Sequence, residues 1–193
     1  MDIVGIAILG IIAVYAVIAY NGLVKARQMT REAWSGIDVQ LKRRANLIPN
    51  LLATVKGYAK HESDTLAEVT KMRTRVDNVA SGDVAGRAQA EGMLSQALGK
   101  LMMVAESYPD LKANQNFIEL QSALSEMEDE IQMSRRYYNG SARALNVKVE
   151  SFPSNIIANT FKFEMSEYFE LEMMQTGPCH RFHLNNQSRL GPV

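Results

Sequence analysis

The side chains best suited to chemistry in this chain form three small groups. His61 and Glu62 could make an acid–base or metal-ligating pair, but neighbouring residues on a helix point in different directions. Cys179, His180 and His183 form a cluster of soft ligands, yet structural zinc takes four ligands and this segment offers three. We therefore expect a solvated helix face at His61 and a polar tail without a metal around Cys179.

The third group is a cluster of acids in a helical segment. A helical bundle with carboxylates can hold two irons, but such centres need Glu-x-x-His pairs that project inward from facing helices. Nucleophile motifs, phosphate-binding loops and dinucleotide fingerprints are absent from the sequence. We expect no catalytic residue, no metal and no cofactor, and predict that the protein is not an enzyme. The acids are Glu126, Glu128, Asp129 and Glu130.

The sharpest charge feature is the run Lys42-Arg43-Arg44. A cation at the carboxyl end of a helix is stabilised by about 0.3 to 1 kcal/mol, so the run could cap a helix. It could instead bind a protein partner. A lipid-binding role fits less well, because about twenty helical residues beyond the apolar start put the run roughly 30 Å from a membrane, several Debye lengths at physiological salt.

The element that positions these groups is the apolar stretch from Ile3 to Val24, which has 22 residues and no charged side chain. As a helix it would be about 33 Å long, matching a hydrocarbon core of about 30 Å. It predicts a transmembrane anchor over residues 1–24. A cleaved signal peptide is the alternative, but that needs a basic start and a shorter apolar centre.

The charges that flank this stretch predict its orientation. Asp2 is the only charged side chain before it, whereas six Lys or Arg residues follow within about twenty residues. By the positive-inside rule, the carboxyl-terminal side is cytoplasmic and the short amino terminus lies outside. The six are Lys25, Arg27, Arg31, Lys42, Arg43 and Arg44.

Composition bounds the rest of the chain. Beyond the anchor there remain about 170 residues, enough for one domain with a core. The 21 basic and 21 acidic residues balance, which argues against nucleic acid as a partner. Residues 25–75 carry 11 basic against 5 acidic residues, and residues 76–172 carry 8 against 15, so we expect the two halves to pack together. The single cysteine fits a reducing compartment.

Apolar residues recur three and four apart after the anchor, which predicts helices almost throughout. We expect the membrane helix to end around residues 44–48 and a second helix to run from Pro49 to Ala80, because proline favours the first position of a helix. A third helix is expected over 83–107 and a fourth over 114–150. The fourth has a regular seam of Phe117, Leu120, Leu124, Met127, Ile131, Ser134, Tyr138, Ser141 and Leu145.

Such helices with short connections favour an all-α fold in which the transmembrane helix continues into an antiparallel four-helix bundle over residues 25–152. Segments 42–49 and 108–114 would then meet far from the membrane, and 81–83 and 151–155 would lie near it. The far pole gives a candidate partner-binding tip of Lys42, Arg43, Arg44, Asn46, Pro49, Tyr108, Pro109, Asp110 and Lys112.

The carboxyl-terminal part has a different character. Residues 153–170 are expected to form a short aromatic-rich helix near the membrane, and residues 171–193 a polar, disordered tail. The candidate contacts with the membrane surface are Phe152, Ile156, Ile157 and Phe161.

Several motifs resemble the signature of the LemA family: WSGIDVQLKRR at 34–44, LIPNL at 47–51, VKGYA at 55–59, YPDLKAN at 108–114 and FPSN at 152–155. The resemblance implies an amino-terminal membrane helix, a cytoplasmic helical bundle and no established catalytic residues. ALGKLM at 97–102 is similar to the branch that includes the magnetosome protein MamQ. Leu145-Asn146 stands where the family often has Tyr-Asn.

Two functions follow as hypotheses. The first is a membrane-anchored scaffold or adaptor that presents its tip to an unidentified protein partner. The alternative is a membrane-remodelling or magnetosome-type component that acts through homo-oligomers. Both place the chain in a bacterial inner membrane, or in an intracellular membrane derived from it, with the lipid bilayer contacted through residues 3–24.

Overall fold

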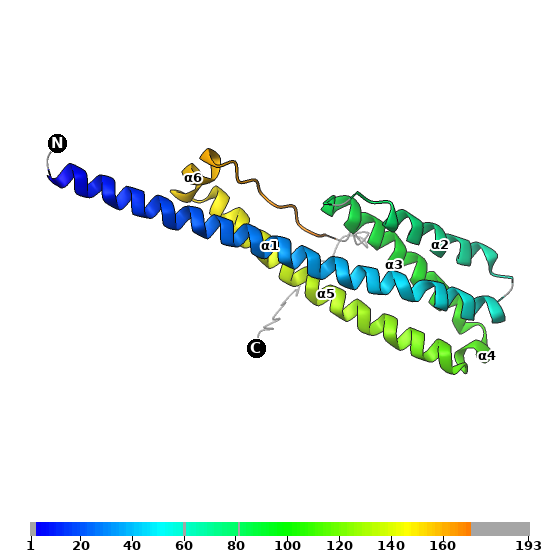
Figure 1. The fold of residues 1–193 in the computed structure, drawn as a ribbon. Helices are drawn as coiled ribbons and strands as arrows, with labels where there is room; N and C mark the ends of the chain where they lie inside the picture. Colours follow the sequence, from blue (N-terminus) through cyan, green and yellow to red (C-terminus); the bar gives the residue numbers. More distant parts are fainter. Residues whose placement is uncertain (1–2, 60, 81, 171–193) are drawn as a thin grey trace, which may run out of the picture.

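The computed structural model describes residues 3–59, 61–80 and 82–170, which form helices and connecting segments without a β-strand (Figure 1). The all-helical fold class is as predicted. The tail at 171–193, with Cys179, His180 and His183, lies outside the described residues. The helices are α1 (Ile3–Tyr58), α2 (Ser63–Asp77), α3 (Val84–Glu106), α4 (Pro109–Lys112), α5 (Gln115–Glu150) and α6 (Ser154–Thr160).

Helix α1 combines the apolar start of the chain with the helical domain. Its 56 residues span about 84 Å. Leu23 is its first buried side chain, and the large apolar side chains from Ile3 to Tyr20 are exposed. By length and composition, α1 can cross a membrane near its amino end. The predicted continuation of the apolar helix into the domain is therefore present.

The predicted end of this helix at 44–48 is wrong, because α1 runs through Pro49 to Tyr58. Proline lacks an N–H, so inside a helix it leaves the carbonyl four residues earlier without its usual donor. Here that carbonyl belongs to Ala45, and it accepts a hydrogen bond of 3.2 Å from Nε of Arg73 on α2. A contact from another helix thus replaces the bond that Pro49 removes.

Helices α1 and α5 form a long antiparallel pair (Figure 1). At one end, Nδ2 of Asn114 donates to the hydroxyl of Tyr58 over 3.0 Å. At the other end, Nζ of Lys148 donates to the carbonyl of Gly22 over 3.2 Å. Helices α2 and α3 form a hairpin that lies along the end of this pair far from residue 3.

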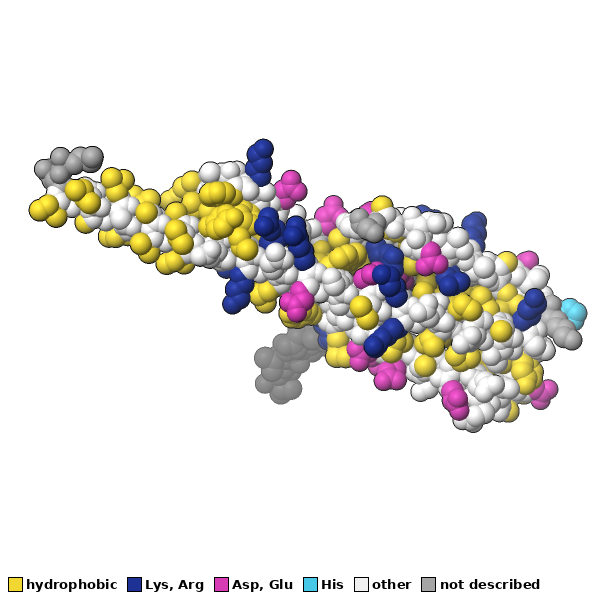
Figure 2. Space-filling view, in the orientation of Figure 1, with side chains coloured by type: hydrophobic (Ala, Val, Ile, Leu, Met, Phe, Trp, Pro, Cys, Tyr) yellow, Lys and Arg dark blue, Asp and Glu magenta, His cyan; other side chains and the backbone are white. Residues whose placement is uncertain are grey.

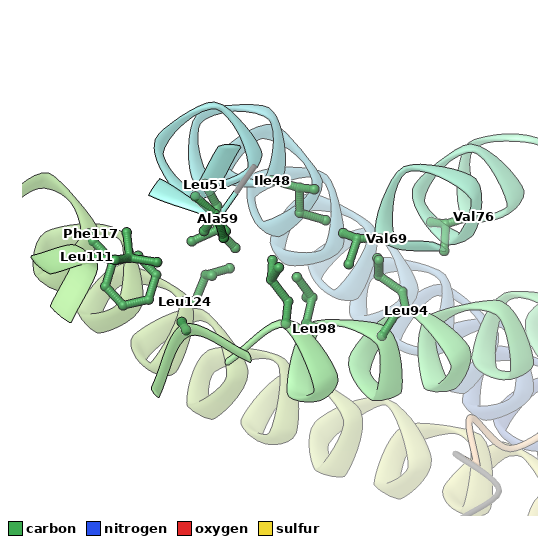
Figure 3. Packing of buried hydrophobic residues seen from close by; sticks show 14 of the residues in the cluster. Ile48, Leu51, Ala59, Val69, Val76, Leu94, Leu98, Leu111, Phe117 and Leu124 are labelled. Carbon is green, nitrogen blue, oxygen red and sulfur yellow. The ribbon is translucent and has the colours of Figure 1, made fainter. Parts of the chain in front are cut away.

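Within the part of the chain that the structure describes, the core consists of three clusters along the molecule. The largest joins residues of α1 to α5, including Ile48, Val69, Leu94 and Phe117 (Figure 3). A middle cluster surrounds Ile37 and Ile131, and the third lies next to the apolar start of α1. The predicted seam of α5 is confirmed, because buried side chains recur every seven residues at Phe117, Leu124, Ile131, Tyr138 and Leu145.

The α2–α3 turn does not reach the level of the membrane helix, contrary to prediction. Helix α2 begins only at Ser63 and has 15 residues instead of the expected span of 49–80. The turn therefore comes level with Trp34 and Lys42, where its Asp77 and Gly82 help line a cavity of about 450 Å³. Gly82 has a φ of 94°, a conformation that glycine adopts without strain.

Candidate functional site

The end of the molecule far from residue 3 is formed by the α1–α2 connection and by α4. Besides the Asn114–Tyr58 bond, the hydroxyl of Tyr108 donates to Glu62 over 3.1 Å. Pro109 begins α4, and Leu111 is buried beneath it, while Asp110 and Lys112 are exposed. Four of the predicted tip residues, Tyr108, Pro109, Asp110 and Lys112, therefore lie at this end. We call the surface of residues 58–59, 61–62 and 108–114 the distal tip.

The other five predicted tip residues are not at the distal tip. Lys42, Arg43, Asn46 and Pro49 are exposed in the last third of α1, nine or more residues before its end, and Arg44 is buried. Pro49 precedes Tyr58 by nine residues, about 13 Å along the helix. The helix-capping interpretation of Lys42-Arg43-Arg44 is also wrong, since α1 continues to Tyr58 beyond it.

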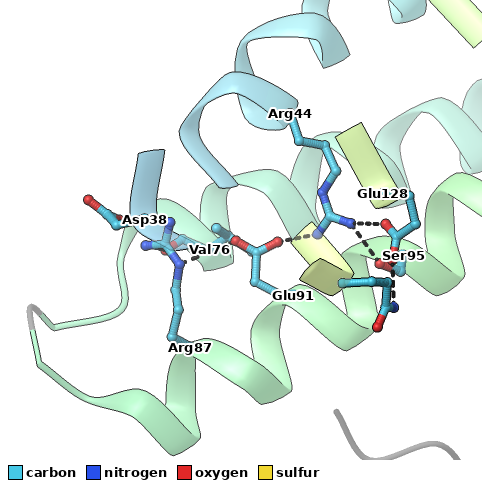
Figure 4. A network of polar contacts seen from close by, with 8 residues as sticks. Asp38, Arg44, Val76, Arg87, Glu91, Ser95 and Glu128 are labelled. Atoms are coloured by element: carbon cyan, nitrogen blue, oxygen red, sulfur yellow. Dashed lines mark hydrogen bonds and ion pairs between the residues drawn. The ribbon is translucent and has the colours of Figure 1, made fainter. Parts of the chain in front are cut away.

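Arg44 is the centre of a polar network between three helices (Figure 4). Its guanidinium donates to Glu128 of α5 over 2.7 Å, to Ser95 of α3 over 3.0 Å and to Glu91 of α3. Glu91 also pairs with Nε of Arg87 at 3.2 Å. The side chains of Arg44 and Glu91 are only 3% and 2% exposed, so both charges are removed from water.

Burial raises the pKa of Glu91 above its ordinary value, while the charges and hydrogen bonds of Arg44 and Arg87 act to lower it. A buried ion pair has a desolvation cost that can exceed its Coulombic attraction, so it is weak evidence of stabilisation. Breaking it by removing one partner is nevertheless costly, because the other charge stays buried. The network therefore fixes how α1, α3 and α5 are placed against one another.

The remaining charged candidates either bind other residues of the fold or are exposed to solvent. Glu130 accepts a hydrogen bond from Gln40 over 3.3 Å, and Glu126 is exposed. Glu62 binds Tyr108, and the neighbouring His61 is exposed. Within residues 3–59, 61–80 and 82–170, no three His, Cys, Asp or Glu side chains converge on a position where a metal could bind.

The predicted membrane-surface residues lie beside the apolar start of α1. The ring of Phe161 is 4.8 Å from that of Tyr20, centroid to centroid. Phe152, Ile156 and Phe161 are 80%, 57% and 55% exposed, and Ile157 is partly buried. Figure 2 shows hydrophobic side chains gathered over this end, with Lys and Arg side chains next to them. We call Phe152, Ile156 and Phe161 the α6 patch.

The predicted helix over 153–170 is shorter than expected, because α6 ends at Thr160 and residues 163–170 are extended. This extended segment, the strap, runs along α5. The amide of Asn146 both donates to the carbonyl of Ser166 over 2.9 Å and accepts from its N–H over 2.8 Å. Asn139 makes the same pair of bonds with Phe169, at 3.2 and 2.9 Å.

Two aromatic side chains anchor the strap between α1 and α5. Phe163 is buried, and the guanidinium carbon of Arg27 lies 4.7 Å from its ring centroid. Phe169 is fully buried, 5.9 Å from the ring of Trp34. The sequence analysis missed these contacts. Two asparagines one heptad apart, at 139 and 146, are the signal that could have indicated them.

Comparison with known proteins gives a consistent set of relatives. The LemA family model matches residues 33–182. Magnetosome protein MamQ 2 of Paramagnetospirillum magneticum is 27% identical, over 86% of this chain and 70% of its own. Protein LemA of Metamycoplasma hominis is 29% identical, over 72% of this chain and 63% of its own. Magnetosome protein MamQ of Magnetospirillum gryphiswaldense is 25% identical, over 78% of this chain and 64% of its own.

The family match covers α2 to α6, the strap and α1 from Ala33 onward. It includes the Arg44 network and both asparagine clamps, the paired hydrogen bonds that Asn139 and Asn146 make with the strap. Together with the all-helical fold and the long apolar start of α1, this match shows that the chain belongs to the LemA family.

Proposed function

We propose that the protein is a membrane-anchored scaffold whose helical domain holds the distal tip at a fixed height for a protein partner. The observation that carries this proposal is the continuity of α1 from the apolar stretch to Tyr58. The 34 residues from Val24 to Tyr58 put the distal tip about 50 Å beyond the end of the apolar stretch. The Arg44 network and the largest core cluster hold the helices rigidly against one another. They therefore keep that distance constant.

The same proposal gives an orientation and a place. The basic residues that follow the apolar stretch favour a cytoplasmic position for the helical domain. We place the anchor in a bacterial inner membrane or in an intracellular membrane derived from it. The Metamycoplasma hominis and magnetosome relatives support a bacterial setting.

Site-specific photocrosslinking in native membranes tests the scaffold function. A photoreactive residue at Asp110 or Lys112 should crosslink to a defined protein, because both positions are exposed at the distal tip. The matched control places the same residue at Lys42, which is exposed in the last third of α1. Equal products at Lys42 and Lys112, or none at the tip, would contradict a partner-binding tip.

A second function is favoured by one observation, the exposure of the α6 patch next to Tyr20. Proteins rarely leave large apolar groups together in water without a use for them. Two of the relatives carry the name of magnetosome proteins. The second candidate is therefore a component that shapes such a membrane through oligomers, with the α6 patch inserted into the bilayer surface.

Vesicles separate the two candidate functions. The full chain with Phe152→Ser and Ile156→Ser should lose any ability to deform vesicles if the α6 patch shapes membranes. The matched control, Ile118→Ser with Met133→Ser, removes two exposed apolar side chains of α5. Vesicles left unchanged by the unaltered chain at high surface density would contradict this second function and leave the scaffold function in place.

A further inference from the structure

A cationic cavity lies where the strap begins, close to the end of the apolar stretch. It has a volume of about 240 Å³, and its lining includes Arg27, Arg31, Lys162 and Glu164. Three cations face one carboxylate, so the charge around the cavity is positive. Leu145 of α5 and Thr30 of α1 also line it. Helices α1 and α5 and the strap therefore all contribute to this one cavity.

The three cations of this cavity form no ion pair within the described residues, although Arg27 also packs over the ring of Phe163. Among the described residues, no carboxylate oxygen lies within 4.0 Å of the charged nitrogens of Arg27, Arg31 or Lys162. Nε of Arg27 is buried and has no hydrogen-bond partner within that part of the chain. A buried donor without a partner is destabilising, so its presence calls for a ligand that accepts a hydrogen bond from it.

The backbone conformation of Lys162 also indicates that its cation has a role in this cavity. Its φ is 53°, in the left-handed region that lysine rarely adopts. Glycine would take this conformation without strain. A lysine here puts a cation at the rim of the cavity, where glycine would leave none.

The distance of the cavity from the end of the apolar stretch places it relative to the lipid headgroups. Arg27 and Arg31 follow Val24 by three and seven residues, about 5 and 10 Å along α1. The headgroup layer on each side of a bilayer is about 5 to 7 Å thick, so the cavity is at headgroup level or just beyond it. The α6 patch and Tyr20 lie beside it and can face the acyl chains.

We propose that this cavity binds the phosphate of an anionic phospholipid headgroup. Arg27 and Arg31 can donate to phosphate oxygens, and arginine suits that geometry. The positive surplus disfavours a choline headgroup, whose own cation would be repelled. Glu164 can accept from a headgroup hydroxyl, which makes phosphatidylglycerol the appropriate probe. This inference rests on the proposed membrane anchorage.

The test is lipid binding to the full-length protein in a neutral detergent, measured by native mass spectrometry during titration with phosphatidylglycerol. Arg31→Gln with Lys162→Gln removes two exposed cations of the cavity, and affinity should fall roughly 10- to 30-fold. The control, Lys25→Gln with Arg143→Gln, removes two exposed cations outside the cavity lining. Its affinity should change less than about threefold.

Three results would overturn the inference. Equal losses in the two double variants would mean general surface charge, and no loss in either would mean that the cavity does not bind the headgroup. Competition by inorganic phosphate at the same concentration as the lipid would assign the cavity to a soluble phosphate. Flotation of the unaltered chain with phosphatidylcholine vesicles tests anchorage separately, so failure there overturns the proposed function and not the cavity.

Discussion

At the scale of single residues, Arg73 replaces a hydrogen bond that Pro49 removes from α1. Pro49 removes the donor for the carbonyl of Ala45, and Arg73 supplies another from α2. Ala45 is buried, so its carbonyl would otherwise lack both water and a helical partner. This one bond explains how a proline can sit nine residues inside the end of α1.

Arg73→Ala should therefore lower the free energy of unfolding of the protein by about 1 to 3 kcal/mol. In a Pro49→Ala background, where the helical N–H is restored, the same change should have less than about half that effect. Urea unfolding of the four proteins in detergent gives the coupling. Arg75→Ala, an exposed neighbour, is the control. Equal losses in both backgrounds would contradict the exchange of donors.

Glu91 gives a prediction about pH. Its pKa is raised from about 4.5 by burial, so its protonated form is favoured in the folded state. Its contribution to stability is therefore fully present below pH 4.5 and is lost as the pH rises through the raised pKa. Glu91→Gln removes this titration and keeps an oxygen for Arg44.

The unfolding free energy of Glu91→Gln should consequently rise relative to that of the unaltered protein as the pH increases from about 4.5 through the raised pKa of Glu91. Denaturant titrations at several pH values measure the difference. If the unaltered protein gains on the variant as the pH rises, the ion pairs with Arg44 and Arg87 outweigh the burial.

At the scale of elements, the strap fits α5 because the spacing of two asparagines along the helix matches the spacing of their partners along the strap. Seven residues of helix rise about 10.5 Å, and three extended residues cover about 10 Å. Asn146 and Asn139, seven residues apart on α5, can therefore meet Ser166 and Phe169, three residues apart on the strap. The two asparagine clamps bind the main chain of the strap, and Phe163 and Phe169 are its side chains that are buried between α1 and α5.

Asn139→Ala or Asn146→Ala should release the strap locally. Each change removes two hydrogen bonds, so exchange of the amide hydrogens at Phe169 or Ser166 should become about tenfold faster or more. The thermal unfolding of the helices should shift little. Asn116→Ala, at an exposed position of α5, is the control. Unchanged exchange at both amides would show that the aromatic anchors alone hold the strap.

These elements also show what the sequence can and cannot predict. The bounds of α3 and α5 and the heptad seam were predicted closely, because they depend on local spacing and on caps such as Asn114, which accepts from the N–H of Phe117. The end of α1 was predicted wrongly, because it depends on Arg73 in another helix. That error misplaced half of the candidate tip. The strap depends on contacts between residues about twenty to thirty positions apart, which no local pattern shows.

At the scale of the whole molecule, charge and shape give the protein two ends. One end carries the apolar stretch, the α6 patch and the cationic cavity, and the other carries the distal tip (Figure 2). The basic residues after Val24 predict a cytoplasmic helical domain. A reporter that is active only in the cytoplasm, fused after Val193, should be active, and a periplasmic reporter should not. The reverse result would overturn the proposed orientation.

In the proposed arrangement, α1 holds the distal tip far from the membrane while α6 lies on the membrane surface. Fluorescence energy transfer from single labels to acceptors on lipid headgroups measures both heights, after Cys179→Ser removes the native thiol. A label at Ile156 should lie within about 10 Å of the headgroups and one at Asp110 about 50 Å away, with Lys42 between them. Equal transfer from Ile156 and Asp110 would mean that the domain lies flat on the bilayer, and would contradict this arrangement.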